Sequence, residues 1–259
     1  MFGGDSSAAP PSSDVAELVS EGAGELQAGE YKDAFKHFQL ADKRSQGESW
    51  DAVAGAATAA LRLGKASRAH EYAERLLEMD QSPRRKGTAL YLLGVSLAGL
   101  NKLSESEVTL RQFLDLVPDA PFQTRTVLVS VMCRQNKHDE ALALLDEQGL
   151  CAERADEPAT DGPPQFEPGG KITEPVKLSG PYPEYPEQDR LARIQGTVVL
   201  DSLIGTDGTI HCVRVLDGPS PAMGCSAAVA VMNWKFQPST LDGEVVEVYY
   251  NLAVRFQLR

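Results

Sequence analysis

The sequence lacks any long apolar run. No segment reaches the roughly eighteen consecutive apolar residues that a membrane-spanning helix requires. The opening residues, 1–6, contain neither the basic segment nor the apolar segment of a secretory signal. The chain as given is therefore predicted neither to span a membrane nor to carry an export signal.

Positive charge is also scarce. The 259 residues contain 25 Lys and Arg against 37 Asp and Glu, a formal net charge of −12, and the first basic residue is Lys32. Such an excess of negative charge repels a phosphate backbone. We therefore expect no nucleic acid among the partners.

Cysteines are few, and none has the C-x-x-C spacing of a zinc site. They are Cys133, Cys151, Cys212 and Cys225. Two alternatives stay open: Cys212 and Cys225 form a disulfide that closes a short loop, or all the cysteines are reduced and pack as small apolar side chains. The redox state of the compartment decides between them.

Catalytic motifs are missing as well. The histidines lie far apart, at positions 37, 70, 138 and 211, and the sequence has no phosphate-binding loop, nucleophile elbow or zinc-protease motif. His211 and Cys212 are adjacent, but neighbours on a strand point to opposite faces. We therefore predict a protein that is not an enzyme and that needs no cofactor or metal.

What the sequence does contain is two unlike halves, as its length predicts at about 150 residues per domain. Between residues 152 and 184, seven prolines and four glycines exclude a helix and favour a stiff, extended linker. The predicted organisation is a disordered leader at 1–13, a helical domain at 14–151, the proline- and glycine-rich linker at 152–184 and a second domain at 185–259.

The first half has the apolar spacing of helices, and it repeats. Small residues recur at Ala34, Ala69, Ser106 and Ala141, which are 35, 37 and 35 positions apart. Helical hairpins with a period of about 34 residues are typical of an α-solenoid. This half resembles the tetratricopeptide (TPR) family, which places a small residue where two helices cross. We expect an all-α TPR-type solenoid of about four helical hairpins.

The TPR resemblance implies a concave groove that the first helix of each hairpin lines. Its positions fall on small and apolar residues: Val19, Ala23, Leu26, Ala54, Thr58, Leu61, Tyr91, Val95, Ala98, Thr126, Ser130 and Cys133. A groove that grips a terminal carboxylate needs several converging cationic and amide side chains, and only Arg62 and Arg134 are near. The groove is therefore expected to take an apolar peptide or a neighbouring domain.

The second half changes to the two-residue period of strands. Alternating runs flank Asp207-Gly208, which predicts a β-hairpin. Residues 222–234 have the spacing of a helix, and residues 244–259 alternate as one long strand. This half is therefore predicted to be a small antiparallel sheet with one helix, in the order ββαβ.

Several short motifs accompany that order, among them Tyr185-Pro186, Gly196-Thr197-Val198-Val199 and Trp234-Lys235-Phe236-Gln237-Pro238. With them, residues from about 171 to 259 resemble the TonB C-terminal domain family. The expected fold class is thus α+β in two domains, a TPR-type solenoid followed by a TonB-like sheet.

A small sheet with one covering helix leaves its last strand with unpaired backbone groups, to which an extended peptide can add as a further strand. The resemblance implies that this peptide is the N-terminal box of an outer-membrane TonB-dependent transporter. The expected partner-binding residues lie on the last strand and at its approach: Tyr249, Asn251, Ala253, Arg255, Tyr185 and Pro186.

The resemblance therefore implies a periplasmic cell-envelope protein that binds a transporter, with energy coupling as a further role and with TPR repeats that recruit proteins. The alternative is a non-transducing scaffold or adaptor of an envelope machine for motility or secretion, acting through the TPR groove. A TonB transducer has an N-terminal membrane helix, so three explanations stay open: a missing anchor or signal, a periplasmic adaptor, or a cytoplasmic protein. A homodimer formed by exchange of last strands is also open.

Overall fold

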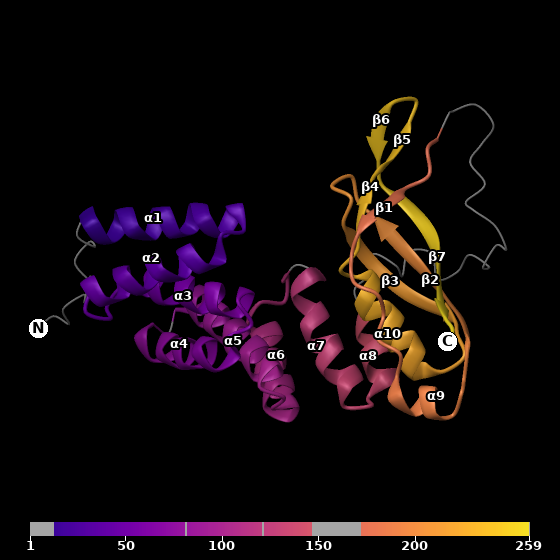
Figure 1. The fold of residues 1–259 in the computed structure, drawn as a ribbon, viewed down its shortest axis with the longest axis horizontal. Coiled ribbons are helices and arrows are strands. Elements are labelled where there is room, and N and C mark those ends of the chain that lie inside the picture. The colour runs from indigo at the N-terminus through magenta and orange to yellow at the C-terminus, as the bar shows by residue number, and fades with distance from the viewer. Residues whose placement is uncertain (1–12, 81, 121, 147–171, 259) are drawn as a thin grey trace, which may run out of the picture. The chain divides into compact units, whose positions relative to one another are not determined.

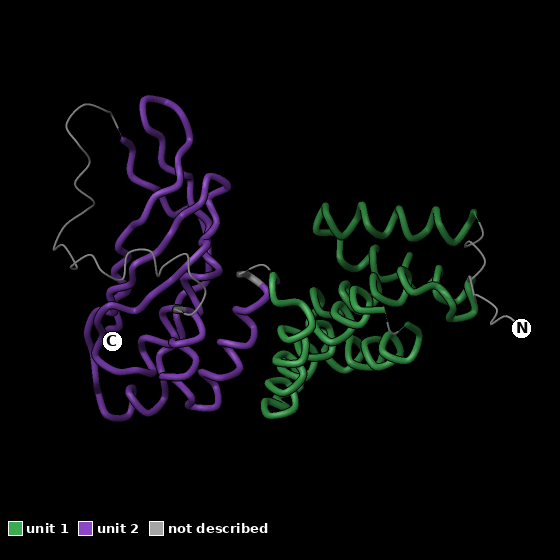
Figure 2. The backbone as a smooth tube through the Cα atoms, turned by 180° about the vertical axis from the view of Figure 1, so that it is seen from behind, with its two compact units in different colours: residues 1–119 green, residues 120–259 purple. Residues whose placement is uncertain are grey.

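The computed structural model describes residues 13–80, 82–120, 122–146 and 172–258. The chain divides into two compact units, residues 1–119 and 120–259, which Figure 2 colours separately. Residues 1–12 of the expected leader and residues 152–171 of the expected linker lie outside the described part. The boundary at 119/120 falls within the segment that the sequence assigns to the helical domain.

The first unit contains three helical hairpins, whose successive helices pack on one another (Figure 1). The helices are α1 (Ser13–Ala28), α2 (Tyr31–Arg44), α3 (Trp50–Arg62), α4 (Ala66–Met79), α5 (Pro83–Gly99) and α6 (Leu103–Leu116). Small residues at the crossings are fully buried, including Ala34, Ala69 and Ser106. The polar Ser106 is tolerated at its buried helix crossing because its Oγ donates a hydrogen bond to the carbonyl of Gly94 at 2.7 Å.

The same turn closes every hairpin, including the fourth, which lies in the second unit. Gly29, Gly64, Asn101 and Asn136 have positive φ angles between 60° and 81°. In each turn the next residue donates its backbone N–H to the carbonyl five positions earlier, at 2.8 to 3.0 Å. Glycine and asparagine are the residues that best tolerate this conformation. The two asparagines therefore replace glycine without changing the turn, and the expected repeat is present.

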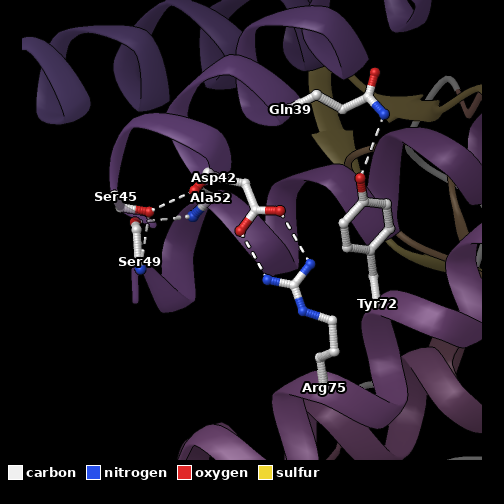
Figure 3. Close-up of polar contacts among 7 residues, drawn as sticks. All are labelled: Gln39, Asp42, Ser45, Ser49, Ala52, Tyr72 and Arg75. Atoms are coloured by element: carbon white, nitrogen blue, oxygen red, sulfur yellow. Dashed lines mark hydrogen bonds and ion pairs between the residues drawn. The ribbon is translucent and has the colours of Figure 1, made fainter. Parts of the chain in front are cut away.

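Polar contacts link α2 to α4, the second helices of consecutive hairpins (Figure 3). The guanidinium of Arg75 donates to both carboxylate oxygens of Asp42, at 2.8 and 3.0 Å. Gln39 Nε2 donates to the hydroxyl of Tyr72 at 3.4 Å. Both pairs are 33 positions apart, one repeat, as stacked hairpins require. The hydrogen bonds to Asp42 raise the pKa of Arg75 above its usual value.

The second unit joins the fourth hairpin to the sheet. Its helices α7 (Phe122–Arg134) and α8 (His138–Asp146) pack on α10 (Pro221–Val231) and on β3 (Ile210–Asp217). The approach is close because α10 is rich in small residues, and Leu142 of α8 lies over Gly224. The hairpin that the sequence assigns to the solenoid therefore shares its core with the sheet.

The sheet has three antiparallel strands in the order β3-β2-β7, with β2 (Gly196–Ile204) in the centre and β7 (Val248–Phe256) at one edge. The β2–β3 hairpin turns at Gly208, whose φ is 72°, as the sequence predicts. Together with the helical hairpins and α10, this sheet confirms the expected α+β class. The short helix α9 (Glu187–Leu191) precedes β2.

Two predictions for the second half need adjustment. Residues 244–259 form two strands, because the turn at Asp242-Gly243, with φ of 52° and 94°, folds β6 (Glu244–Val246) back onto β5 (Ser239–Leu241). Only β7 joins the main sheet. Within the segment expected as linker, β1 (Val176–Ser179) pairs with β4 (Lys235–Gln237). Its neighbouring prolines keep the backbone extended, which a short edge strand accommodates.

The disulfide prediction is wrong in both of its alternatives. Cys225 on α10 is bonded to Cys133 on α7, and Cys212 is disulfide-bonded to a partner other than Cys225. Cys212 packs beside Leu203 and Tyr249, on the face of the sheet that points away from α10. Cys225 faces α7 instead, so the two cysteines that are close in sequence lie on opposite sides of the sheet.

Candidate functional site

The candidate site is the outer edge of β7. This strand pairs with β2 over nine positions, from Gly196↔Phe256 to Ile204↔Val248, and with no other strand of the described residues. In an antiparallel ladder, alternate residues of an edge strand direct their N–H and C=O groups away from the sheet. β7 therefore presents a row of backbone donors and acceptors to an incoming strand.

The side chains of β7 alternate as the sequence predicts. Val248, Leu252, Val254 and Phe256 are buried on the face that packs toward α10, while Asn251, Ala253 and Arg255 are exposed on the other face. We call these last three residues the exposed row. Three of the predicted partner-binding residues thus lie together on one accessible face of the edge strand.

Tyr249 and Tyr250, at the start of β7, are both half-buried. Tyr249 packs against the cluster of Leu203 and Cys212. The hydroxyl of Tyr250 donates to Glu174 at 3.4 Å, and burial raises the pKa of this tyrosine. These rings support the start of the strand, and Tyr249 is less accessible than the exposed row beyond it.

A buried carboxylate, paired with a half-buried arginine, lies on the same face of the sheet as the exposed row. Asp201 in the middle of β2 is 5% exposed, and its Oδ2 lies 3.5 Å from Nη2 of Arg214 on β3. Asp201 is also the register partner of Asn251. A carboxylate in mid-strand is tolerated here because a cation from the neighbouring strand compensates its charge.

Tyr185 reaches β7 from the other face. Its ring makes an edge-on contact with Phe256, with centroids 5.6 Å apart, and its hydroxyl donates to the carbonyl of Ile194. Pro186 occupies the N-cap position of α9 and makes no side-chain capping hydrogen bond. Because Phe256 is buried on the face opposite the exposed row, Tyr185 contacts the end of the strand from that face.

Tyr185 and Pro186 instead line a groove of about 870 Å³ with Ser130 and Cys133 of α7. The third wall is α10, and the Cys133–Cys225 disulfide lies at the groove. The sequence analysis assigned Ser130 and Cys133 to the TPR groove and Tyr185 and Pro186 to the approach of the last strand. It did not bring these residues together because it did not predict the disulfide between Cys133 and Cys225, which are 92 positions apart.

The segment before α9 is held against α10 and β4 by polar contacts. Nε1 of Trp234 donates to the carbonyl of Pro181 at 2.8 Å, and Ser226 donates to the carbonyl of Glu184. Nζ of Lys177 lies 3.2 Å from the ring centroid of Trp234, and burial lowers the pKa of this lysine. The proline-rich wall of the groove is therefore anchored along its length.

The predicted TPR groove is divided between the two units. Val19, Leu26, Ala54 and Leu61 are half-buried and pack against the core cluster of the first unit. Thr58 donates its hydroxyl to the carbonyl of Ala54 at 2.8 Å, and Ala23 is exposed. The apolar side chains among these positions are therefore partly covered by the core of the first unit.

The last two rows of that groove have different surroundings. Tyr91 packs on Phe113 with ring centroids 5.4 Å apart, and burial raises its pKa. Val95 is half-buried and Ala98 is buried. Thr126, Ser130 and Cys133 belong to the second unit, where Ser130 and Cys133 line the groove of about 870 Å³.

In the described parts of the chain, no group of three or more His, Cys, Asp and Glu side chains is arranged to hold a metal ion. His211 instead contacts the carboxylate of Glu247, with Nδ1 3.0 Å from Oε2. Over the same residues, no helix is both long and apolar enough to cross a bilayer.

Comparison with known proteins finds a family similarity in the C-terminal part. Residues 181–258 match the family model for the Gram-negative bacterial TonB protein C-terminal. No curated protein matches the chain.

The solved structures that align with part of this chain include TPR proteins. The second TPR domain of the human RPAP3 protein, determined in complex with an HSP70 peptide, is 21% identical with a TM-score of 0.42 and aligns over 47% of this chain and 98% of that domain. YrrB, a TPR protein with an unusual peptide-binding site, is 17% identical with a TM-score of 0.42 over 51% of this chain and 66% of YrrB. The first TPR domain of human RPAP3 is 19% identical with a TM-score of 0.41, over 52% of this chain and 97% of that domain. Over residues 181–258 the chain is thus similar to the TonB C-terminal family, and helical hairpins precede that segment.

Proposed function

We propose that this chain is a TonB-like cell-envelope protein that binds an extended peptide of an outer-membrane transporter by strand addition to β7. The observation that carries the proposal is the accessible edge of this strand, on which Asn251, Ala253 and Arg255 are all exposed. A guest strand would gain main-chain hydrogen bonds from the edge and selectivity from the outward side chains. The helical hairpins would recruit further proteins.

The disulfides support a location in the periplasm. Cys133 is bonded to Cys225, and Cys212 is bonded as well, so every cysteine of the described residues is oxidised. Such bonds persist in oxidising compartments, which include the bacterial periplasm.

A transducer would transmit force through the β7 contact, whereas an adaptor would use the same contact only to hold its partner. The peptide binding proposed here is common to both.

The test is a titration of the ¹⁵N-labelled full chain with a synthetic peptide from the N-terminus of a TonB-dependent transporter. We expect shifts of the backbone amides from Tyr249 to Arg255. The control is the same peptide with prolines at alternate positions, which removes the donors that pair with an edge. If neither peptide moves these amides at millimolar concentration, strand addition at β7 is wrong.

A second candidate is a scaffold that recruits its partner through the helical hairpins. It is supported by the groove where Ser130 of α7 faces the anchored proline-rich segment. Ser130→Trp would fill this groove and leave β7 unchanged. A scaffold would lose its partner through this substitution, while a peptide-binding edge would keep its affinity for the transporter peptide.

A further inference from the structure

The groove between α7, α10 and residues 181–188 has a disulfide in its wall. Cys133 and Cys225 both line it, and their bond joins α7 to α10. Cys133 is half-buried, whereas Cys225 is only 1% exposed. Two helices of one unit are therefore linked covalently at a place that an outside molecule can approach, and Cys133 is the more accessible end of the link.

Cys212, the other oxidised cysteine of the described residues, has different surroundings. It is 3% exposed and packs beside Leu203 and Tyr249. A reagent reaches a sulfur buried in this way only when the chain opens locally. The bond of Cys212 therefore has the setting of a purely structural disulfide, while the bond of Cys133 opens onto a groove of about 870 Å³.

The hairpin of α7 and α8 also has packing that does not need the Cys133–Cys225 bond. Leu142 of α8 lies over Gly224 of α10, and Leu128 and Met132 of α7 are each only 1% exposed. Burial of this kind stabilises the hairpin against the sheet whether the sulfurs are bonded or separate. The bond can therefore be exchanged without unfolding the unit.

We propose that the groove is a thiol–disulfide exchange site, at which a protein dithiol reduces the Cys133–Cys225 bond. One thiolate of the dithiol attacks Sγ of Cys133, and Cys225 leaves as a thiolate and takes up a proton. The second thiolate of the dithiol then attacks the mixed disulfide, so that Cys133 is released and protonated. Two electrons and two protons pass to this chain, and the dithiol becomes a disulfide.

The lining of the groove suits an anionic nucleophile on a polypeptide. Arg134, which follows the open cysteine on α7, and His138 of α8 both line the groove. Of the two carboxylates in the lining, Glu187 is paired with an arginine of its own helix at 2.6 Å, and the other belongs to Glu184. A nearby cation favours a thiolate over a thiol. The groove volume is in the range that holds a short peptide segment.

Exchange would alter the groove itself. Once the bond is reduced, α7 is held to α10 by packing alone, so the width of the groove is no longer fixed covalently. The facing wall keeps its own contacts, because Trp234 and Ser226 still donate to the carbonyls of Pro181 and Glu184. The oxidised and reduced chains therefore present different grooves, and this inference does not depend on strand addition at β7.

The experiment traps the mixed disulfide on the folded, oxidised full chain. The protein probe is a thioredoxin whose second cysteine is replaced by serine, so that the first step cannot be resolved. Dithiothreitol is the small dithiol probe. Mass spectrometry of peptides after alkylation identifies which cysteine has reacted and at what rate, and amide spectra show that the chain stays folded.

We expect the thioredoxin to be bonded to Cys133, and the Cys133–Cys225 bond to be reduced at least about tenfold faster than the bond of Cys212, whose sulfur is reached only by local opening. Ser130→Trp, which fills the groove, should slow the reaction at Cys133. Ser67→Trp, at an exposed position of α4, is the matched control and should leave the rate unchanged.

Each other outcome contradicts a defined part of the proposal. If neither probe reduces the folded chain, or if the bonds of Cys133 and Cys212 react at the same rate, the bond has only a structural role. If dithiothreitol reacts and thioredoxin does not, a protein dithiol is the wrong partner. If the thioredoxin bonds to Cys225, or if Ser130→Trp has no effect, the groove is not the route to the bond.

Discussion

Cys133 and Cys225 join α7 to α10 across 92 positions of sequence. Cys225 lies inside the segment that matches the TonB C-terminal family, residues 181–258, and Cys133 lies before it. The disulfide therefore makes a helical hairpin from outside the family match a covalent part of the unit that carries β7. The structural unit at the C-terminus is larger than the sequence family alone defines.

Removing this disulfide should destabilise the second unit. In the loop-entropy account, a cross-link over about 90 residues restricts the unfolded chain by about 4 to 5 kcal/mol, and measured losses range from about 2 to 5 kcal/mol. We expect the double variant Cys133→Ser and Cys225→Ser to lower the free energy of unfolding within that range, measured by denaturant unfolding. Hydrogen exchange of α1–α6 serves as the internal control and should not change. An unaltered unfolding midpoint would contradict the structural role of the bond.

Gly55 should not tolerate a side chain. A Cβ at this position of α3 would lie 2.2 Å from the ring of Phe38, which is 2% exposed. We expect Gly55→Ala to destabilise the first unit by about 1 to 3 kcal/mol through overpacking, measured by thermal unfolding.

The matched control for that substitution is Gly24→Ala on α1. A Cβ there meets nothing within 4 Å. Alanine favours a helix over glycine by up to about 1 kcal/mol, so this variant should be neutral or stabilised. Equal effects of the two alanines would show that α2 and α3 do not approach as closely as described.

The contact between Arg75 and Asp42 should require arginine. Lysine keeps the charge but cannot donate two parallel hydrogen bonds to one carboxylate. We expect Arg75→Lys to cost about 1 kcal/mol and to speed hydrogen exchange in α2 and α4. Arg68→Lys, whose pair with Glu71 is exposed, is the control and should cost close to nothing. A similar loss in both variants would refute the special role of the Asp42 contact.

The first hairpin should be more stable in mild acid. Nδ1 of His37 lies 2.7 Å from Oε2 of Glu25, and this hydrogen bond, with the nearby Glu21, raises the pKa of His37 above its ordinary value of 6.5. Because the folded state binds the proton more tightly, the stabilisation is fully present below 6.5 and is lost as pH rises through the folded-state pKa.

The measurement is hydrogen exchange of α1 and α2 at pH 5.5 and 8.5, corrected for intrinsic rates, together with an NMR titration of the His37 ring. Protection should fall toward the higher pH in the wild type. In His37→Gln this His37-dependent change should be absent. A titration midpoint of His37 at or below 6.5 would show that the contact with Glu25 does not stabilise the protonated ring.

The features that could be predicted from sequence are those with a local cause. The spacing of Ala34, Ala69, Ser106 and Ala141 predicted the hairpins because a helix crossing needs a small residue once per repeat. The alternation from Val248 to Phe256 predicted which side chains of the last strand face outward, since the period of a strand is two. In this way Asn251, Ala253 and Arg255 were predicted to face outward, and all three are exposed; that they bind a partner stays a prediction.

The predictions that required correction depend on contacts between distant segments. Tyr185 and Pro186 were expected at the approach of the last strand; Tyr185 contacts Phe256 of that strand, on the face opposite the exposed row, which the sequence could not show, and partner binding by both residues stays a prediction. The last strand was expected to be continuous, but its first residues, β6, pair with β5 and not with the main sheet. The alternation of side chains along a strand does not indicate which other strand it pairs with.

The amino-acid order by itself determined the repeat, the turns, the change from helices to strands and the face of each side chain, because these follow from the geometry of a few neighbouring residues. Only the tertiary structure decided that Cys225 bonds to Cys133, that the fourth hairpin packs with the sheet, and that β7 pairs with β2 and with no other strand among the described residues. These depend on which surfaces bury each other, a free energy shared among residues that are far apart along the chain.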